Sequence, residues 1–98
     1  MDKELTARMI ETGRNLIPAH MWGAIERYML HGIPPGSFLT AVLSNDLREA
    51  FARADDENTA CMKQWVQFLY SYAPSGSWGS PEHFHSWIAK FTKAEEAA

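Results

Sequence analysis

Apolar residues recur every three or four positions along most of the chain, a spacing that places them on one face of an α-helix. No stretch alternates between apolar and polar residues for long enough to predict a β-strand. We therefore predict an all-α fold, a compact irregular bundle of four to five helices joined by connections of about two to eight residues. The predicted helices cover residues 3–16, 18–31, 37–54, 55–72 and 80–92.

Residues with strong positional preferences mark the ends of these helices. Gly32 is a natural stop after the second helix, because glycine readily adopts the left-handed conformation that often follows a last turn. Ser37 and Ser80 are the expected N-caps of the third and last helices, and each follows a glycine. Either Asp55 or Asp56 can cap the fourth helix, where extra carboxylates also suit the positive helix end.

A carboxylate interrupts the apolar face of the third predicted helix. That face consists of Leu39, Val42, Leu43, Leu47, Ala50, Phe51 and Ala54. Because Asp46 falls within the same stripe, we expect it to be partly buried, and a buried carboxylate needs partners. Its simplest role is a structural ion pair with Arg27, Arg48 or Arg53. The alternative is that Asp46 helps to bind a ligand.

The chain is short enough to form one helical domain over residues 1–98. Residues 1–16 are expected to form a loosely packed first helix, because Gly13 weakens its end by about 1 kcal/mol relative to alanine. Residues 93–98 are expected to fray as a short polar tail.

Composition and charge exclude several classes of function. Hydrophobic residues make up 46% of the chain and charged residues 21%, with a formal net charge of −3. The nine basic residues are scattered, which argues against binding to duplex nucleic acid. No apolar run is long enough for a membrane span, and the charged N-terminus is unlike a secretory signal. Cys61 is the only cysteine, so we expect a cytoplasmic protein without a disulfide.

The residues of known catalytic and metal-binding motifs are missing from the sequence. His83 and His85 are two positions apart, so on a helix they point in different directions and cannot share one metal ion. Cys61 lies on the inner face of a predicted helix and is most simply a buried structural thiol. We predict no metal site, no cofactor and no enzymatic activity. A small enzyme using Asp46 or a histidine is the weakest alternative.

Two glycine–serine pairs at predicted helix starts are candidates for binding an anion, because free backbone N–H groups there attract phosphate or carboxylate. Arg27 could clamp such an anion, and Trp78 could stack on a base or contact a partner protein. The predicted ligand-binding residues are Arg27, Gly36, Ser37, Asn45, Asp46, Trp78, Gly79 and Ser80. The simpler roles are plain helix capping for the serines, a salt bridge for Arg27 and a lid over the core for Trp78.

The sequence also resembles a family of small, uncharacterised proteins of tailed bacteriophages and prophages. The resemblance covers roughly residues 20–87. Its motifs are the segments 34–39, 41–43, 45–47, 53–55 and 78–80, together with Asn58. It implies an accessory role inside an infected bacterium, where short phage proteins often counter host defence by sequestering a nucleotide signal or by binding a defence protein.

Two functions from different classes follow. The first is a non-catalytic protein that binds a small anionic, nucleotide-like ligand, with a site that would fit between the subunits of a homo-oligomer. The alternative is a protein-interaction module that inhibits a host protein through an aromatic surface patch, because aromatic side chains and arginine are the usual anchors of such interfaces. DNA binding by a helix-turn-helix is disfavoured, because the third helix has no basic residue before Arg48.

Overall fold

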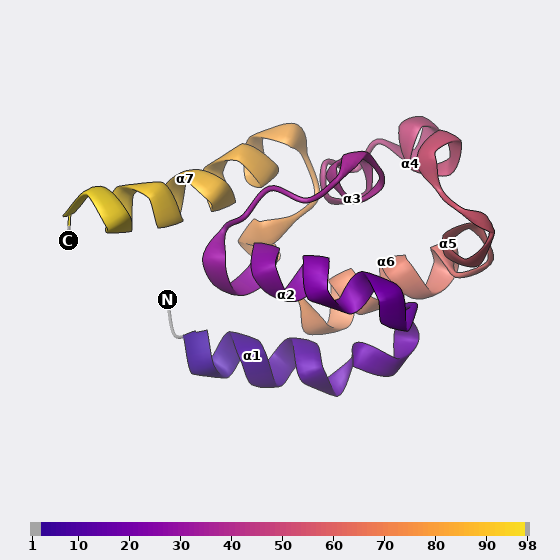
Figure 1. The fold of residues 1–98 in the computed structure, drawn as a ribbon, viewed down its shortest axis with the longest axis horizontal. Helices are drawn as coiled ribbons and strands as arrows, with labels where there is room; N and C mark the ends of the chain where they lie inside the picture. The colour runs from indigo at the N-terminus through magenta and orange to yellow at the C-terminus, as the bar shows by residue number, and fades with distance from the viewer. Residues whose placement is uncertain (1–2, 98) are drawn as a thin grey trace.

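The computed structural model describes residues 3–97, and the side chains of residues 3–94. This part of the chain forms seven α-helices and three short 3₁₀ turns, and no strand (Figure 1). The all-α prediction is confirmed, whereas the predicted count of four to five helices is wrong. The elements are α1 (Lys3–Thr12), η1 (Arg14–Leu16), η2 (Ala19–Met21), α2 (Trp22–His31), α3 (Ser37–Leu43), α4 (Leu47–Arg53), α5 (Asp56–Ala60), α6 (Met62–Tyr72), η3 (Ser75–Ser77) and α7 (Pro81–Ala97).

The predicted helix over residues 37–54 is divided in two by a turn at Asn45. Asn45 has a φ of 62°, in the left-handed region that asparagine tolerates better than most residues. Asp46 then caps α4, because its Oδ1 accepts a hydrogen bond from the Glu49 backbone N–H at 3.2 Å. Asp46 is exposed, so the prediction that it is partly buried is wrong. The turn also rotates α4, so that Leu47 is exposed instead of lying in the core.

The predicted helix over residues 55–72 is divided at Cys61, whose backbone is not helical. Asp55 caps the first part, α5, by accepting a hydrogen bond from the Asn58 backbone N–H at 2.7 Å, which confirms one of the two predicted caps. Cys61 is the one residue between α5 and α6. Across this break the buried Asn58 accepts a hydrogen bond from the Trp65 indole N–H at 3.0 Å.

Aromatic side chains make up a large part of the core. Seven of the twelve aromatic residues are buried: Trp22, Tyr28, Phe38, Trp65, Phe68, Phe84 and Trp87. The predicted inner face of the last helix is confirmed by Phe84 and Trp87, which lie against α2. Gly32 ends α2 in the predicted left-handed conformation, with a φ of 66°.

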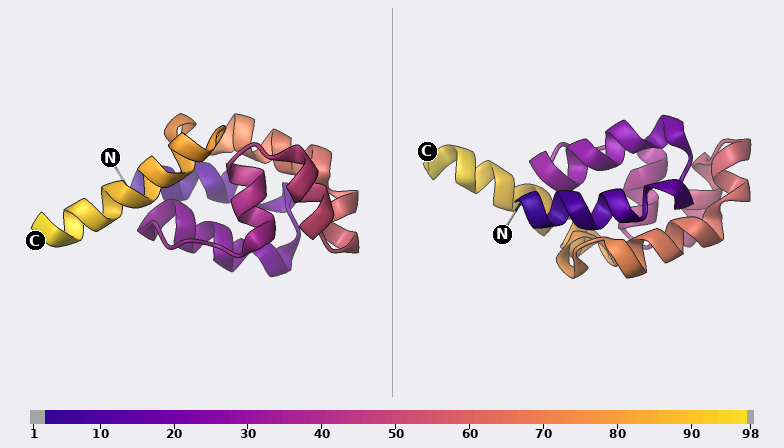
Figure 2. Two further views of the ribbon diagram at one scale, coloured as in Figure 1. Left: turned by 90° about the horizontal axis from the view of Figure 1, so that it is seen from above. Right: turned by 90° about the horizontal axis from the view of Figure 1, so that it is seen from below.

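The first helix and the last helix lie at the edges of this core. α1 packs against α2 and α6 and buries Ile10. Gly13 follows α1 at the point where the Tyr72 ring occupies the space that a Cβ would need. Figure 2 shows α7 extending beyond the other helices at one end of the molecule, with α4 and α5 at the opposite end. Residues 93–97, predicted to fray, belong to α7, and Ala98 lies outside the described residues.

Candidate functional site

A shallow groove lies between the turn that joins α3 to α4 and the first half of α6. Its lining is largely apolar and its enclosed volume is about 50 Å³. The lining residues are Val42, Asn45, Asp46, Leu47, Ala50, Met62, Trp65 and Val66. α4 and the start of α6, which contribute much of this lining, lie at the end of the molecule opposite the C-terminal half of α7 (Figures 1 and 2).

Exposed apolar side chains are concentrated on the two helices that flank this groove. Six large hydrophobic side chains are exposed in the described part of the chain, and four of them belong to α4 or α6. On α4 these are Leu47, 67% exposed, and Phe51, 47% exposed. On α6 they are Val66, 57% exposed, and Tyr70, 81% exposed. Each pair is separated by four residues, so both members lie along one side of their helix.

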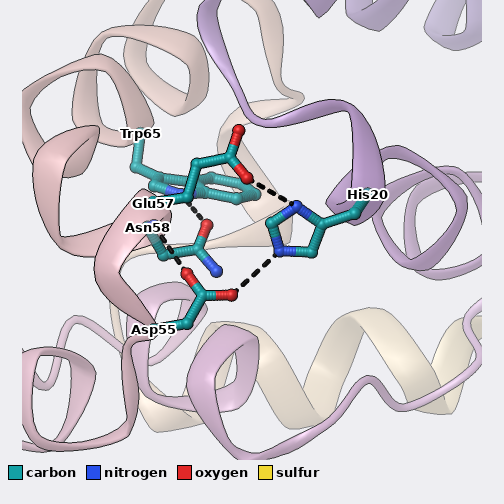
Figure 3. A network of polar contacts seen from close by, with 5 residues as sticks. All are labelled: His20, Asp55, Glu57, Asn58 and Trp65. Carbon is teal, nitrogen blue, oxygen red and sulfur yellow. Dashed lines mark hydrogen bonds and ion pairs between the residues drawn. The ribbon is translucent and has the colours of Figure 1, made fainter.

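Trp65 forms part of the groove lining, and its indole N–H is held by a buried hydrogen bond. The indole donates to Asn58 Oδ1 at 3.0 Å, and the Asn58 backbone N–H donates to Asp55 Oδ1 at 2.7 Å (Figure 3). Trp65 also makes edge-to-face contacts with Phe38 and Phe68. The ring is therefore fixed in position, and it forms a rigid, buried part of the groove lining.

The same network ends on a histidine at the protein surface. His20 Nε2 lies 3.0 Å from Asp55 Oδ2, and His20 Nδ1 lies 3.1 Å from Glu57 Oε1 (Figure 3). The contact with Asp55 is a hydrogen bond, and the contact with Glu57 is an ion pair when the imidazole is protonated. The hydrogen bond from the Asn58 backbone N–H is the main cause that lowers the pKa of the Asp55 carboxyl below its usual value. Desolvation raises this pKa, and the contact with His20 lowers it further. His20 thus ties η2 to α5.

The predicted ligand-binding residues separate into groups. Asn45 and Asp46 line the groove together. Gly79 contacts the end of α3, where its N–H donates a hydrogen bond to the Leu43 carbonyl at 2.9 Å. Trp78 is partly buried against the core, as its simpler role as a lid requires. Ser80 caps α7 as predicted, because its Oγ accepts a hydrogen bond from the His83 N–H at 3.0 Å.

The remaining predicted residues lie elsewhere. Gly36 holds the N-cap position of α3, and Ser37 is the first helical residue without a capping hydrogen bond, so the prediction that Ser37 caps α3 is wrong. Arg27 is exposed on α2, and its guanidinium lies over Gly23. Among the described residues, no ion pair joins Arg27 to Asp46, and no hydrogen bond connects Arg27 with the groove. Binding of an anion by this set stays a prediction.

The flanking residues Leu47, Phe51, Val66 and Tyr70 were missed as candidates for function, because the apolar periodicity assigned Leu47, Phe51 and Val66 to buried faces. A local signal was present. Asp46 followed three residues later by Glu49 is the pattern of a helix start, with a capping residue and an acidic third position. With a second helix beginning at Leu47, the periodicity of the helix that begins at Ser37 no longer requires Leu47 to be buried.

No protein-family model, curated protein or solved structure matches this chain. The fold and the groove therefore define the class of protein only as a small all-α protein with an exposed apolar groove. In the part of the chain that the structure describes, every helix is too short or too polar to cross a bilayer. No three histidine, cysteine, aspartate or glutamate side chains there are grouped as a metal ion would need.

Proposed function

We propose that the protein is a non-catalytic interaction module, and that the groove between α4 and α6 binds one helix of a partner protein. The observation that carries this proposal is the concentration of exposed apolar side chains on both sides of the groove. Single exposed hydrophobic residues are normal on a protein surface, but a cluster beside a groove marks an interaction site.

The dimensions of the groove favour a helix. Met62 and Val66 line the groove, and the exposed Tyr70 continues the same side of α6 beyond it at the same interval of four residues, so the apolar strip on α6 spans about 12 Å. That length matches about two turns of a partner helix, whose apolar residues at i and i+4 would enter the groove as anchors. A volume of about 50 Å³ accepts the end of a side chain. Pockets for small molecules usually enclose about 300–1,000 Å³.

The resemblance to small phage proteins supplies a biological setting for this module. In that setting the partner is a host protein inside the infected bacterium. The module inhibits this host protein by binding one of its helices in the groove. Phe51 and Tyr70 give the flanks of the groove the aromatic character that is enriched at such interfaces. The host partner and the phage setting are parts of the proposal.

The proposal is tested with an isotopically labelled protein and a synthetic probe. The probe is a 16-residue amphipathic helical peptide with leucines at helical spacing, and a peptide of the same composition in scrambled order is its control. We expect the probe to shift backbone NMR signals of α4 and α6, and the scrambled peptide to shift none. Signals that stay unchanged with the probe would refute the proposal.

Two variants locate the binding surface. Leu47→Glu and Val66→Glu place a charge on the two flanks of the groove and should abolish the shifts, because a buried unpaired charge opposes docking. Ile33→Glu is the matched control, since Ile33 is 46% exposed and lies outside the groove. Equal loss of binding in all three variants would show that the probe responds to general hydrophobicity and not to this surface.

The small anionic ligand predicted from the sequence is the competing function. A thermal-shift panel of mononucleotides, cyclic dinucleotides and inorganic phosphate tests it directly. A ligand at 100 times its Kd stabilises the fold by about 2.7 kcal/mol, which is worth roughly 10–20 °C in a domain of this size. Such a shift, lost in a folded Arg27→Ala variant, would favour the anion-binding function over the interaction module.

A further inference from the structure

Resting on the proposed function, we infer that the groove selects a partner helix that carries a basic side chain at the end of its apolar stripe, facing Asp46. The groove is apolar along its flanks, and Asp46 is the only charged residue among its described lining residues. Its carboxylate is therefore the one charged group of this lining that could orient a partner helix.

The Asp46 carboxylate has capacity left for a partner. Its Oδ1 accepts the Glu49 backbone N–H, and no cation of the described part of the chain pairs with it. The arginines expected from the sequence to neutralise it do not do so. Arg53 pairs with Glu49 at 3.1 Å, and Arg27 lies on α2 over Gly23. The carboxylate is thus exposed at the edge of an apolar surface and lacks an opposite charge.

An apolar helix that docks against Leu47 and Val66 would bring its next turn close to this carboxylate. A lysine or arginine three or four residues beyond the last apolar anchor lies on the same face of the partner helix. Its methylene stem would cover the edge of the groove while its charged end meets Asp46. A glutamate at that position would face the Asp46 carboxylate with like charge, and docking would partly remove both from water.

The positive charges nearby do not reverse this preference. Arg48 follows Leu47 on α4, and Lys63 follows Met62 on α6, and both side chains are exposed. Neither residue lines the groove. A docked helix would therefore contact Asp46 directly and neither of these cations.

The inference is tested with three probe peptides that differ only at the position facing Asp46, which holds lysine, glutamine or glutamate. These three residues have similar helix propensities, so differences in binding report on charge. Affinity is measured by fluorescence anisotropy of labelled peptides at low salt. We expect the lysine peptide to bind roughly two- to fivefold more tightly than the glutamine peptide, and the glutamate peptide to bind more weakly than both.

The decisive variant is Asp46→Asn, because asparagine is as good an N-cap as aspartate and removes only the charge. The ratio of affinities between the lysine and glutamate peptides should fall to about one, while the glutamine peptide should bind as it does to the natural protein. Glu49→Gln is the matched control, since Glu49 is an exposed carboxylate of α4 outside the groove lining. It should leave the ratio unchanged.

The outcomes separate the inference from the proposed function. Binding of none of the three peptides would refute the groove as a docking site and the charge selection with it. Equal binding of all three would refute the charge selection and leave the docking site intact. A lysine preference that persists in Asp46→Asn would also overturn the inference, because the cation would then be recognised by another group.

Discussion

The hydroxyl of Tyr28 donates a hydrogen bond to the backbone carbonyl of Ser77 at 2.7 Å, and both residues are fully buried. The bond joins α2 to η3 across 49 residues of sequence. The Tyr28 ring stacks on Phe84 with 5.5 Å between ring centroids, and the Trp87 indole donates to the Tyr28 carbonyl at 3.0 Å. One residue of α2 therefore fixes both the loop before α7 and the first two turns of that helix.

Tyr28→Phe removes this donor and keeps the ring. The Ser77 carbonyl would lose its hydrogen-bond partner in the core, so we expect the free energy of unfolding to fall by about 1–3 kcal/mol in urea denaturation. Tyr70→Phe is the matched control, because Tyr70 is 81% exposed and its substitution should change stability by less than about 0.5 kcal/mol. Equal stability of the two variants would show that the Tyr28 hydrogen bond contributes nothing net.

Alkaline pH tests the same residue in another way. Burial raises the pKa of the Tyr28 hydroxyl well above its usual value, so the folded state favours the neutral form. The stabilisation linked to this shift is complete below the unfolded-state pKa of about 10 and is lost as pH rises above it. Unfolding curves at pH 8, 10 and 11 should show a steeper loss for the natural protein than for Tyr28→Phe. Parallel curves would contradict the linkage.

The glycine that ends α2 is predicted to be intolerant of any side chain. Gly32 has a φ of 66°, and the ring of Phe91 occupies the place of a Cβ. Gly32→Ala should cost at least about 1–2 kcal/mol of stability from the backbone conformation alone, before Phe91 is displaced. Gly76→Ala is the control, since the only atom near a Cβ there is the flexible Lys90 Nζ at 3.8 Å and the backbone is not left-handed. Its thermal midpoint should stay close to that of the natural protein.

The buried amide beneath the groove is the next test. Asn58→Ala leaves the Trp65 indole N–H without its acceptor in the core, and we expect a loss of about 1–3 kcal/mol in chemical denaturation. Because Trp65 lines the groove, its fluorescence should also change in the folded variant. Asn15→Ala, at an exposed position, is the control and should leave both readouts unchanged. A variant as stable as the natural protein would show that Trp65 finds another acceptor.

Local signals in the sequence predicted several ends of helices correctly. Gly32 ends α2, Asp55 caps α5 and Ser80 caps α7, because each effect depends on a few neighbouring residues. The breaks at Asn45 and Cys61 were missed, since the apolar periodicity continues across both. At Asn45 a local signal competes with that periodicity, because Asp46 and Glu49 form the pattern of a helix start.

The candidate site was predictable only in part for the same reason. Asn45 and Asp46 were identified as polar residues of interest, and they do line the groove. Leu47 and Val66 were assigned to the core, because periodicity shows that apolar residues share a face but not whether that face is covered. Which face another helix covers depends on the turns between helices, and two of those turns were not predicted.

Acidic pH provides a last test, centred on Asp55. Hydrogen bonding by the Asn58 backbone N–H, followed by the contact with His20, holds the pKa of the Asp55 carboxyl below its unfolded value of about 4. The charged form therefore stabilises the fold above pH 4, and this contribution is lost as pH falls through the lowered folded-state pKa. Asp55→Asn keeps an N-cap but removes the charge, so the natural protein should be more stable than the variant at pH 6. That difference should shrink steadily below pH 4 in thermal unfolding followed by circular dichroism.

Asp56→Asn, one residue away, is the control and should show no such pH-dependent difference from the natural protein. An identical pH profile for the two variants would assign the effect to general charge rather than to the contacts of Asp55.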